Sequence, residues 1–400
     1  MILNLTVIVG ALGYFVDIYD LVLFSIVRIQ SLTALGVPPS ELLPVGVRLI
    51  NCQMVGMLIG GLVWGILGDK KGRVSVLFGS ILLYSVANIL NAFVQNLEQY
   101  AVLRFVAGLG LAGELGAAIT LVSEVLPKET RGYGTAVVAG VGLSGAVFAG
   151  IVGDLLSWRI AYLSGGLFGF LLLLLRLQLL ESGLFKKAGT VSITRGSLWM
   201  ILKSRERLLK LINCTLIGVP IWFFIGIIVT FAPEITQALG AREDISSGRG
   251  ILFGYAGIAI GDLLSGSLSQ WIGSRKKVVG IFLTAYGLLV AITLLSHGFG
   301  AQYFYSLCFL MGLFTGYWAV FVTISAEQFG TNLRATVATS VPNFVRGSVV
   351  IMTSSFRNLA LPLGTIGAAA TVGGTAIALG FIALFFLPET HAKELDYFER

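Results

Sequence analysis

The sequence predicts an all-α membrane protein of twelve transmembrane helices, arranged as two pseudo-symmetric bundles of six helices. Three observations lead to this fold class. Of the 400 residues, 56% are hydrophobic and only 12% are charged, whereas soluble proteins carry about 25% charged residues. Apolar runs long enough to cross ~30 Å of hydrocarbon recur along the whole chain. The basic residues lie in the short loops between these runs, where they act as orientation signals.

The apolar runs between polar breaks predict the twelve spans in chain order. The first six are expected over 4–27, 45–68, 74–95, 99–125, 133–156 and 159–180. The second six are expected over 209–233, 250–273, 278–296, 302–326, 335–357 and 363–387. We therefore predict an N-terminal six-helix bundle over 1–182, a linker over 183–207 and a C-terminal six-helix bundle over 208–400.

The loops differ in charge from one side of the predicted membrane to the other. DKKGR at 69–73, PKETR at 127–131 and SRKK at 274–277 share one side with the basic linker and the C-terminal tail. The opposite loops, such as NAFVQNLEQ, hold few or no basic residues. By the positive-inside rule, both termini and the linker are cytoplasmic in a multi-pass protein of the inner or plasma membrane.

Two pairs of motifs repeat between the halves at nearly the same offset. GILGDKKGR begins at Gly65 and GSLSQWIGSRKK at Gly266, 201 residues apart. EVLPKETRG begins at Glu124 and EQFGTNLRA at Glu327, 203 residues apart. The repeats predict two parallel six-span halves about an axis along the membrane normal, with a site at their interface.

The loop after the second span carries the strongest single motif. GILGDKKGR, from Gly65 to Arg73, matches G-x-x-x-D-[RK]-x-G-[RK], and the chain resembles the major facilitator superfamily over essentially its whole length. Further matches resemble the sugar-porter-like branch: Arg104, Glu124-x-x-Pro127-x-x-x-Arg131, Trp158-Arg159, Glu181-Ser182 and Pro388-Glu389-Thr390. The resemblance implies a secondary transporter, with a cytoplasmic gate in this loop.

The gate is expected to hold charged residues from both halves. An acid at a tight turn can meet an arginine in one conformation and lose it in another. Glu124 and Glu327 each precede an arginine by seven residues, and networks between these pairs and Asp69 would close the inner gate. The alternative is a solvated loop that only fixes topology. The predicted gate residues are Gly65, Asp69, Gly72, Arg73, Glu124, Arg131, Glu327 and Arg334.

Charged residues inside membrane spans are costly and indicate function. Asp17 and Asp20 lie three residues apart and so share one face of the first span, while the fourth span holds Arg104 and Glu114. Burial favours the protonated form of a carboxyl and a nearby arginine favours the charged form. The family resemblance implies Asp20 with Arg104 as the proton-coupling pair. Asp17 and Glu114 are alternatives, as is a structural ion pair between the two spans.

Arg346 lies about eleven residues into the eleventh span, too deep to reach the cytoplasm. Its guanidinium suits a carboxylate or phosphate, so it is a candidate for substrate binding. It could alternatively pair with a membrane acid such as Asp262, Glu114 or Asp17. Span seven lacks the paired glutamines and the asparagine of sugar porters, which disfavours a sugar and, together with Arg346, favours a charged organic metabolite. Asp17 and Asp20 would instead suit a cation if neither serves the proton. Further candidates for the substrate site are Asn343, Gln53, Tyr14, Trp222, Trp318 and Tyr255.

The stretch RFVAGLGLAGELG from Arg104 matches the G-x-G-x-x-G pattern of dinucleotide-binding turns. It lies inside a predicted span and follows no strand, so we expect no nucleotide there. Its small residues instead form two stripes for close helix contact, Gly108, Ala112 and Gly116 in one and Gly110, Gly113 and Ala117 in the other.

The sequence favours a proton-coupled symporter of a small polar or charged organic metabolite, working by alternating access. Alternatives are uniport, proton-antiport efflux of drugs or metabolites, and a non-transporting membrane sensor. We expect no enzyme activity, no cofactor and no metal site, because both histidines lie at span ends without partners at metal-ligand spacing. The expected partners are substrate, protons and the lipid bilayer, without nucleic acid, for a chain that functions as a monomer.

Overall fold

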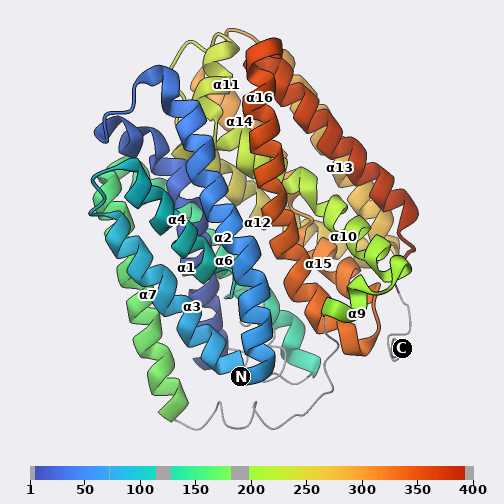
Figure 1. Cartoon of the computed structure of the whole chain (residues 1–400). Helices are drawn as coiled ribbons and strands as arrows, with labels where there is room; N and C mark the ends of the chain where they lie inside the picture. The colour runs from blue at the N-terminus through green and yellow to red at the C-terminus, as the bar shows by residue number, and fades with distance from the viewer. Residues whose placement is uncertain (1–4, 72, 114–127, 182–197, 392–400) are drawn as a thin grey trace. The chain divides into compact units, whose positions relative to one another are not determined.

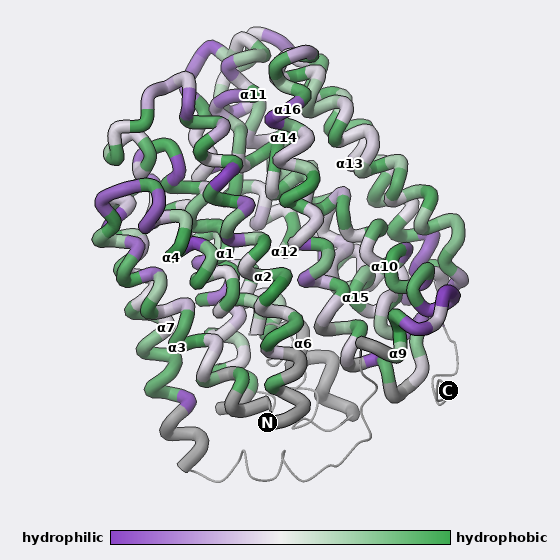
Figure 2. The backbone as a smooth tube through the Cα atoms, viewed as in Figure 1, coloured by the Kyte–Doolittle hydropathy of each residue, from purple (hydrophilic) through white to green (hydrophobic). Residues whose placement is uncertain are grey.

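A computed structural model describes residues 5–71, 73–113, 128–181 and 198–391, and within these ranges the chain is helical with no β-strand (Figure 1). Apolar residues cover most of the length of the helices, as Figure 2 shows in green. Nine helical stretches of the described chain are long and apolar enough to cross a membrane. The predicted all-α, multi-span fold class is therefore confirmed, and the orientation of the termini stays a prediction.

The chain divides into two compact units between Ile193 and Thr194. In the first unit, the described helices are α1 (Leu5–Ala34), η1 (Pro39–Glu41), α2 (Leu42–Lys71), α3 (Arg73–Asn91), α4 (Leu97–Leu111), α6 (Lys128–Leu155) and α7 (Trp158–Glu181). The division into 1–182, 183–207 and 208–400 stays a prediction.

The second unit contains more helical pieces than predicted spans. They are α9 (Leu198–Leu202), α10 (Arg205–Phe223), the π-helical η2 (Phe224–Val229), α11 (Ala232–Ala238), α12 (Ser247–Ile272), α13 (Arg275–Leu295), α14 (Ala301–Thr315), α15 (Trp318–Glu327) and α16 (Thr331–Phe386). The short helix α9 and the start of α10 fall within the range predicted as a linker.

In the first unit, α2 packs along α4, α1 packs along α6 and α7, and α3 contacts α4 and α7. We call the α2–α4 contact the N-terminal seam, formed by Gly56, Gly60 and Gly108. A Cβ atom at any of the three would collide with a backbone carbonyl oxygen of the facing helix, those of Phe105, Leu109 and Gln53 respectively. Such backbone contact is how helices associate in lipid, where no hydrophobic force drives them together.

The second small-residue stripe of α4 faces α3. A Cβ atom at Gly110 would collide with the backbone of Tyr84, and one at Gly113 would crowd Ser80 of α3 and Trp64 of α2. The prediction that these glycines serve close helix packing is therefore confirmed for Gly108, Gly110 and Gly113. Gly116 and Ala117 lie outside the described residues.

The second unit repeats the seam between α12 and α14. We call this contact the C-terminal seam, formed by Gly257, Gly261 and Gly312. Cβ atoms at these positions would collide with the carbonyl oxygens of Phe309, Leu313 and Gly254 respectively. Helix α10 packs along α16 in the same unit, and α13 contacts α14 and α16.

Two predicted spans differ in form from a single straight helix. The span expected over 302–326 is broken between α14 and α15, where Gly316 lies against the backbone of Gly261 and Asp262. The spans expected over 335–357 and 363–387 form one element, α16, with a break at Gly364 (φ 69°, ψ 167°). Its apolar stretch of 51 residues would be ~77 Å long as one helix. This is more than two membrane thicknesses, so the break divides it into two passes.

Candidate functional site

The side chain of Arg104 is completely buried inside the first unit. It lies on α4, one turn before Gly108 of the N-terminal seam. Its Nη2 atom donates a hydrogen bond to Oε1 of Gln53 on α2. The Nε2 atom of Gln53 in turn donates to the carbonyl oxygen of Leu21 on α1 at 3.4 Å. The seam holds the backbones of α2 and α4 in contact, and this contact brings the side chains of Gln53 and Arg104 within hydrogen-bond distance.

Two carboxylates of α1 lie beside this pair. Asp17 and Asp20 are 0% and 1% exposed, as buried as any hydrophobic residue of the core. The charges of Arg104 and Asp17 and the amide of Asn88 act on Asp20. Even so, neither carboxylate oxygen of Asp20 has a hydrogen-bond partner among the described residues. A buried ionised carboxylate without hydrogen bonds is strongly unfavourable, so this arrangement suits a carboxyl group that carries a proton.

Helix α7 packs against Asp20 through the backbone of a glycine, Gly165. A Cβ atom at Gly165 would collide with Oδ1 of Asp20. One turn earlier, the carbonyl oxygen of Ala161 accepts a hydrogen bond of 2.9 Å from the hydroxyl of Tyr19. The space for the Asp20 carboxyl therefore exists because residue 165 has no side chain.

Aromatic rings complete the surroundings of Arg104. Its Cζ atom lies 5.2 Å from the ring centroid of Phe24 and 5.8 Å from that of Tyr162, distances at which a cation is attracted to a ring face. The hydroxyls of Tyr162 and Tyr100 are 2.8 Å apart, and Tyr100 donates to Ser31 at 3.2 Å. All of these side chains are buried or nearly so.

The second unit buries its own arginine, Arg346 of α16, which is 1% exposed. Its Cζ atom lies 6.0 Å from the ring centroid of Trp222 on α10. Pro220 lies inside α10 and the helix continues as the π-helical η2 from Phe224. Proline removes a backbone donor from a helix, and π turns of this kind occur mostly at functional sites. The chain thus places a guanidinium beside an indole at an irregular stretch of helix.

The remaining substrate candidates are divided between the units. Asn343 and Tyr255 are buried in the second unit, and Trp318 is half-buried at the start of α15. Tyr14 is buried in the first unit, where its ring occupies the place that a Cβ atom of Gly142 would take. Gln53, the other candidate of the first unit, is engaged with Arg104.

Asp262 has a structural partner. Its Oδ1 atom accepts a hydrogen bond of 2.9 Å from the backbone N–H of Ala319, in the first turn of α15. A carboxylate there satisfies a backbone donor that the helix leaves open and interacts favourably with the helix dipole. The sequence names Asp262 only as a possible partner of Arg346, and this hydrogen bond instead supports a role in capping α15.

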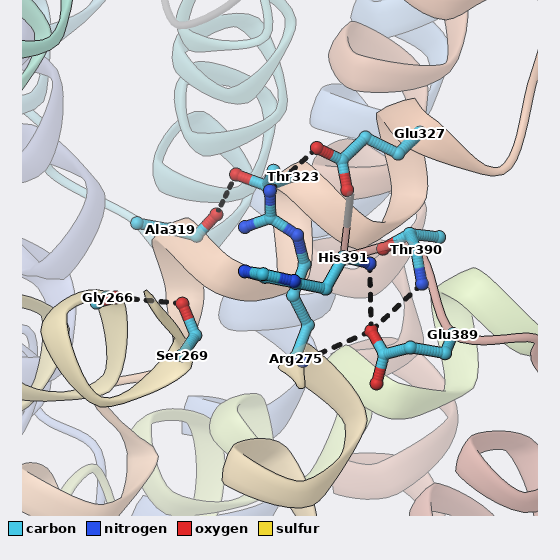
Figure 3. A network of polar contacts seen from close by, with 9 residues as sticks. All are labelled: Gly266, Ser269, Arg275, Ala319, Thr323, Glu327, Glu389, Thr390 and His391. Atoms are coloured by element: carbon cyan, nitrogen blue, oxygen red, sulfur yellow. Dashed lines mark hydrogen bonds and ion pairs between the residues drawn. The ribbon is translucent and has the colours of Figure 1, made fainter. Parts of the chain in front are cut away.

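Of the predicted gate residues, Glu327 forms an ion pair with Arg275 at 2.8 Å (Figure 3). The sequence predicts a network of Glu327 with Arg334 and Asp69, and it marks Arg275 only as part of the basic loop SRKK. Gly72, Glu124 and the coupling candidate Glu114 lie outside the described residues. At Gly65, Asp69, Arg73 and Arg131 the structure describes only the backbone. The gate roles of these four residues therefore stay predictions.

Glu389 follows α16 and binds the start of α13. Its carboxylate accepts hydrogen bonds from the hydroxyl of Ser274 and from the backbone N–H groups of Arg275 and Lys276, at 3.1 and 3.2 Å. Figure 3 shows the contact with Arg275. The backbone N–H groups of Thr390 and His391 donate to it as well. Burial alone would raise the pKa of Glu389, and these hydrogen bonds instead lower its pKa to about 2.

Sequence reasoning missed Glu389 as a site residue, along with Arg275 and Gly165. Pro388-Glu389-Thr390 served only as a family motif, although Ser274 before a basic run is an N-cap signal that points to an anion partner. No sequence signal marks Gly165, because its importance depends on which side chain faces it.

The model of the Major Facilitator Superfamily matches residues 10–365. The gentisate transporter of Corynebacterium glutamicum is 25% identical, over 95% of this chain and 86% of its own length. The 3-(3-hydroxy-phenyl)propionate transporter of Escherichia coli is also 25% identical, over 86% of this chain and 85% of its own. A crystal structure of a D-xylose-proton symporter has the same fold, with a TM-score of 0.69, 16% identity, and coverage of 97% of this chain and 99% of that one.

The family match spans most of the chain and agrees with the fold that the helices and glycine seams build. The resemblance inferred from GILGDKKGR and the accompanying motifs is therefore confirmed. The chain belongs to the major facilitator superfamily and is a multi-pass integral membrane transporter.

Proposed function

We propose that this protein is a proton-coupled symporter of small organic carboxylates and that it works by alternating access. The observation that carries the proposal is the buried group of Asp20, Arg104 and Gln53 in the first unit. The Asp20 carboxyl has no hydrogen bond from the described chain, and Arg104 beside it is bound to Gln53. Asp20 can therefore take and release a proton as Arg104 moves away from it or towards it. Asp17 is the neighbouring carboxyl that would share this role.

The substrate class rests on the second unit. Arg346 is buried beside the indole of Trp222, so a ligand bound there could contact both the guanidinium and an aromatic ring. A carboxylate suits the fork and a planar ring suits the indole. Gentisate and 3-(3-hydroxyphenyl)propionate, which name two relatives, both combine an aromatic ring with a carboxylate. We therefore propose an aromatic or similarly flat carboxylate as the substrate.

The remaining expectations belong to the same proposal. Transport requires no catalytic step, nucleic acid or cofactor, and one chain suffices. The cytoplasmic gate would include Glu327, which is paired with Arg275 in the described structure. Asp69, Arg73, Glu124, Arg131 and Arg334 keep the gate roles that their motifs predict.

The test is uptake into proteoliposomes of purified protein. Labelled gentisate is offered with the outside more acidic than the inside, at equal pH, and with a protonophore. We expect accumulation above the outside concentration only with the gradient and no accumulation with the protonophore. Labelled xylose serves as the comparison, and gradient-driven uptake of xylose instead of gentisate contradicts the carboxylate proposal.

Arg346 is tested against a matched arginine of the same helix. Arg346→Ala is expected to lower gentisate uptake at least about tenfold, the loss that follows from removing a charged hydrogen-bond donor of a bound anion. Arg357→Ala, which removes an exposed arginine of α16, is expected to leave uptake near the wild-type rate. An equal loss of uptake in both variants would mean that Arg346 does not bind the substrate, and would contradict the proposed site.

A further inference from the structure

Arg104 has two possible partners, and the described structure pairs it with only one. Its Nη2 donates to Gln53, while neither carboxylate oxygen of Asp20 has a hydrogen bond from the described chain. Yet the charge of Arg104 acts on Asp20, so the carboxyl lies within electrostatic range of the guanidinium. An arginine has five N–H donors, and Nε and Nη1 of Arg104 also have no acceptor among the described residues. The guanidinium therefore has donors to offer to Asp20.

Gln53 is held so that its oxygen faces Arg104. Its Nε2 donates to the carbonyl oxygen of Leu21, the residue directly after Asp20 on α1. With the amide nitrogen engaged there, Oε1 is the end left for the arginine. The backbone of Gln53 lies against Gly108, where a Cβ atom would collide with its carbonyl oxygen. The amide is thus anchored on α1 and α4, whereas the arginine side chain is long and can move.

The charged and titratable groups around Asp20 come from several helices. Helix α4 supplies Arg104, α1 supplies Asp17 and Tyr19, and α7 supplies Tyr162. Helix α3 contributes only the amide of Asn88. Among the described side chains of α2 and α6, no charged group acts on Asp20. Helix α2 contributes Gln53, which cannot titrate. Arg104 is therefore the one cation in this set.

We propose that Gln53 is a positioning residue that competes with Asp20 for the guanidinium of Arg104. The proposal rests on the proton-coupled function proposed above. When Asp20 is protonated, the Gln53 amide holds Arg104, as in the described structure. When Asp20 loses its proton to the water that reaches it, Arg104 leaves the amide and pairs with the carboxylate. Gln53 stays neutral throughout and exchanges only a hydrogen bond.

The strength of an amide acceptor makes this exchange possible. A hydrogen bond from arginine to a neutral carbonyl oxygen is weaker than one to a carboxylate, where both partners are charged. The order of acceptors is therefore ionised Asp20, then Gln53, then protonated Asp20. A carboxylate at position 53 would not release the arginine, and an apolar side chain would not hold it.

The test is an infrared titration of the carboxyl C=O stretch in purified protein reconstituted in liposomes, without substrate. The Asp20 band is identified by its loss in Asp20→Asn. In Gln53→Met, which keeps the length of the side chain but removes the amide, the midpoint of this band is expected to move about one pH unit lower. The reason is that Arg104, without its amide partner, stabilises the Asp20 carboxylate. Gln328→Met removes a buried amide of the second unit and should leave the midpoint unchanged.

Gln53→Glu provides the opposite test and a second chance if Gln53→Met does not fold. The introduced carboxylate would keep Arg104, so the Asp20 midpoint is expected to rise. The band of the introduced carboxyl is identified by combining Gln53→Glu with Asp20→Asn. Shifts in opposite directions support the competition. An unchanged midpoint, or a shift in the same direction for both variants, would overturn it. Gradient-driven uptake is measured separately, so opposite shifts without such uptake would reject the proposed function and keep this inference.

Discussion

The N-terminal and C-terminal seams share their backbone packing and differ in their chemistry. Gly56 and Gly60 are each 201 residues before Gly257 and Gly261, and the carbonyl oxygens that they face are 204 residues apart. At the same offsets, Gln53 corresponds to Gly254 and Arg104 to Cys308. One seam therefore carries a buried arginine and its amide partner, and the other carries a glycine and a thiol.

The difference separates what the fold needs from what the function needs. The C-terminal seam brings two helices into backbone contact without a buried arginine, so the same contact in the first unit does not require Arg104 or Gln53. A buried arginine is unfavourable in a membrane unless it serves a purpose. The polar group of the first unit is thus an addition to a shared scaffold.

The largest effect is expected from filling either seam. Gly108→Ala and Gly312→Ala each place a Cβ atom against a backbone carbonyl oxygen that no side-chain rotation can move. We expect each to destabilise its unit by about 3 kcal/mol, the upper range for overpacked cores. Thermal unfolding of the purified variants in detergent measures this. If one glycine tolerates alanine and the other does not, the two seams are not mechanically equivalent.

The next effect separates the two seams by function. Asp20→Asn removes a group that can titrate beside the N-terminal seam, and gradient-driven gentisate uptake is expected to fall at least about tenfold, or about 1.4 kcal/mol. Thermal stability should change little, because Asn has nearly the same shape. Cys308→Ser, at the position of the C-terminal seam that matches Arg104, is expected to retain uptake. A similar loss in both variants would speak against a special role for the first unit.

A smaller effect is expected for the membrane acid of the second unit. Asp262→Ala removes the acceptor for the Ala319 N–H at the start of α15, and we expect a loss of about 1 kcal/mol, as for other helix caps. Asp262→Asn keeps an oxygen in place and is expected to keep both stability and gradient-driven uptake. A loss of proton coupling in Asp262→Asn would extend the titrating role to the second unit.

The smallest effect concerns Glu389, whose pKa lies at about 2 because of its hydrogen bonds. A carboxyl with a depressed pKa stabilises the fold above its unfolded value, 4.5 for this group, and this contribution disappears as the pH falls toward 2. Glu389→Gln is therefore expected to lower stability by about 0.5 kcal/mol at pH 7, since the group is exposed, and by less at pH 3. Thermal unfolding at the two pH values measures the difference. An equal loss at both would show that the charge is not the cause.

Most of the fold could be predicted from the sequence, because apolar runs and glycine stripes are local patterns. The breaks at Gly316 and Gly364 were harder to predict. Glycine alone does not mark a break in this chain, since Gly108 and Gly312 lie inside helices. Gly316 differs because the backbone of α12 lies against it and because Asp262 caps the helix that follows. Both contacts come from residues far away in the sequence, so no local pattern reveals them.

The candidate site was predictable in part for the same reason. Asp17, Asp20, Arg104 and Arg346 are conspicuous because charges are rare inside membrane spans. Their contacts were not predictable, since the sequence marks Gln53 and Trp222 only as candidates for the substrate site and gives no signal for Gly165. The pairing of Glu327 with Arg275 also depends on how helices meet rather than on spacing along the chain.

The turn at Gly364 also limits how this chain can change in length. Two membrane passes are joined there by a single residue of positive φ within α16, with no loop to absorb an insertion. Adding or deleting one residue beside it would rotate the following helix by about 100°. Gly373 and Gly380, which lie against Phe223 and Pro220 of α10, would then face elsewhere. Length variants and inserted tags should therefore be tolerated poorly at this turn, even though Leu361 beside it is 92% exposed.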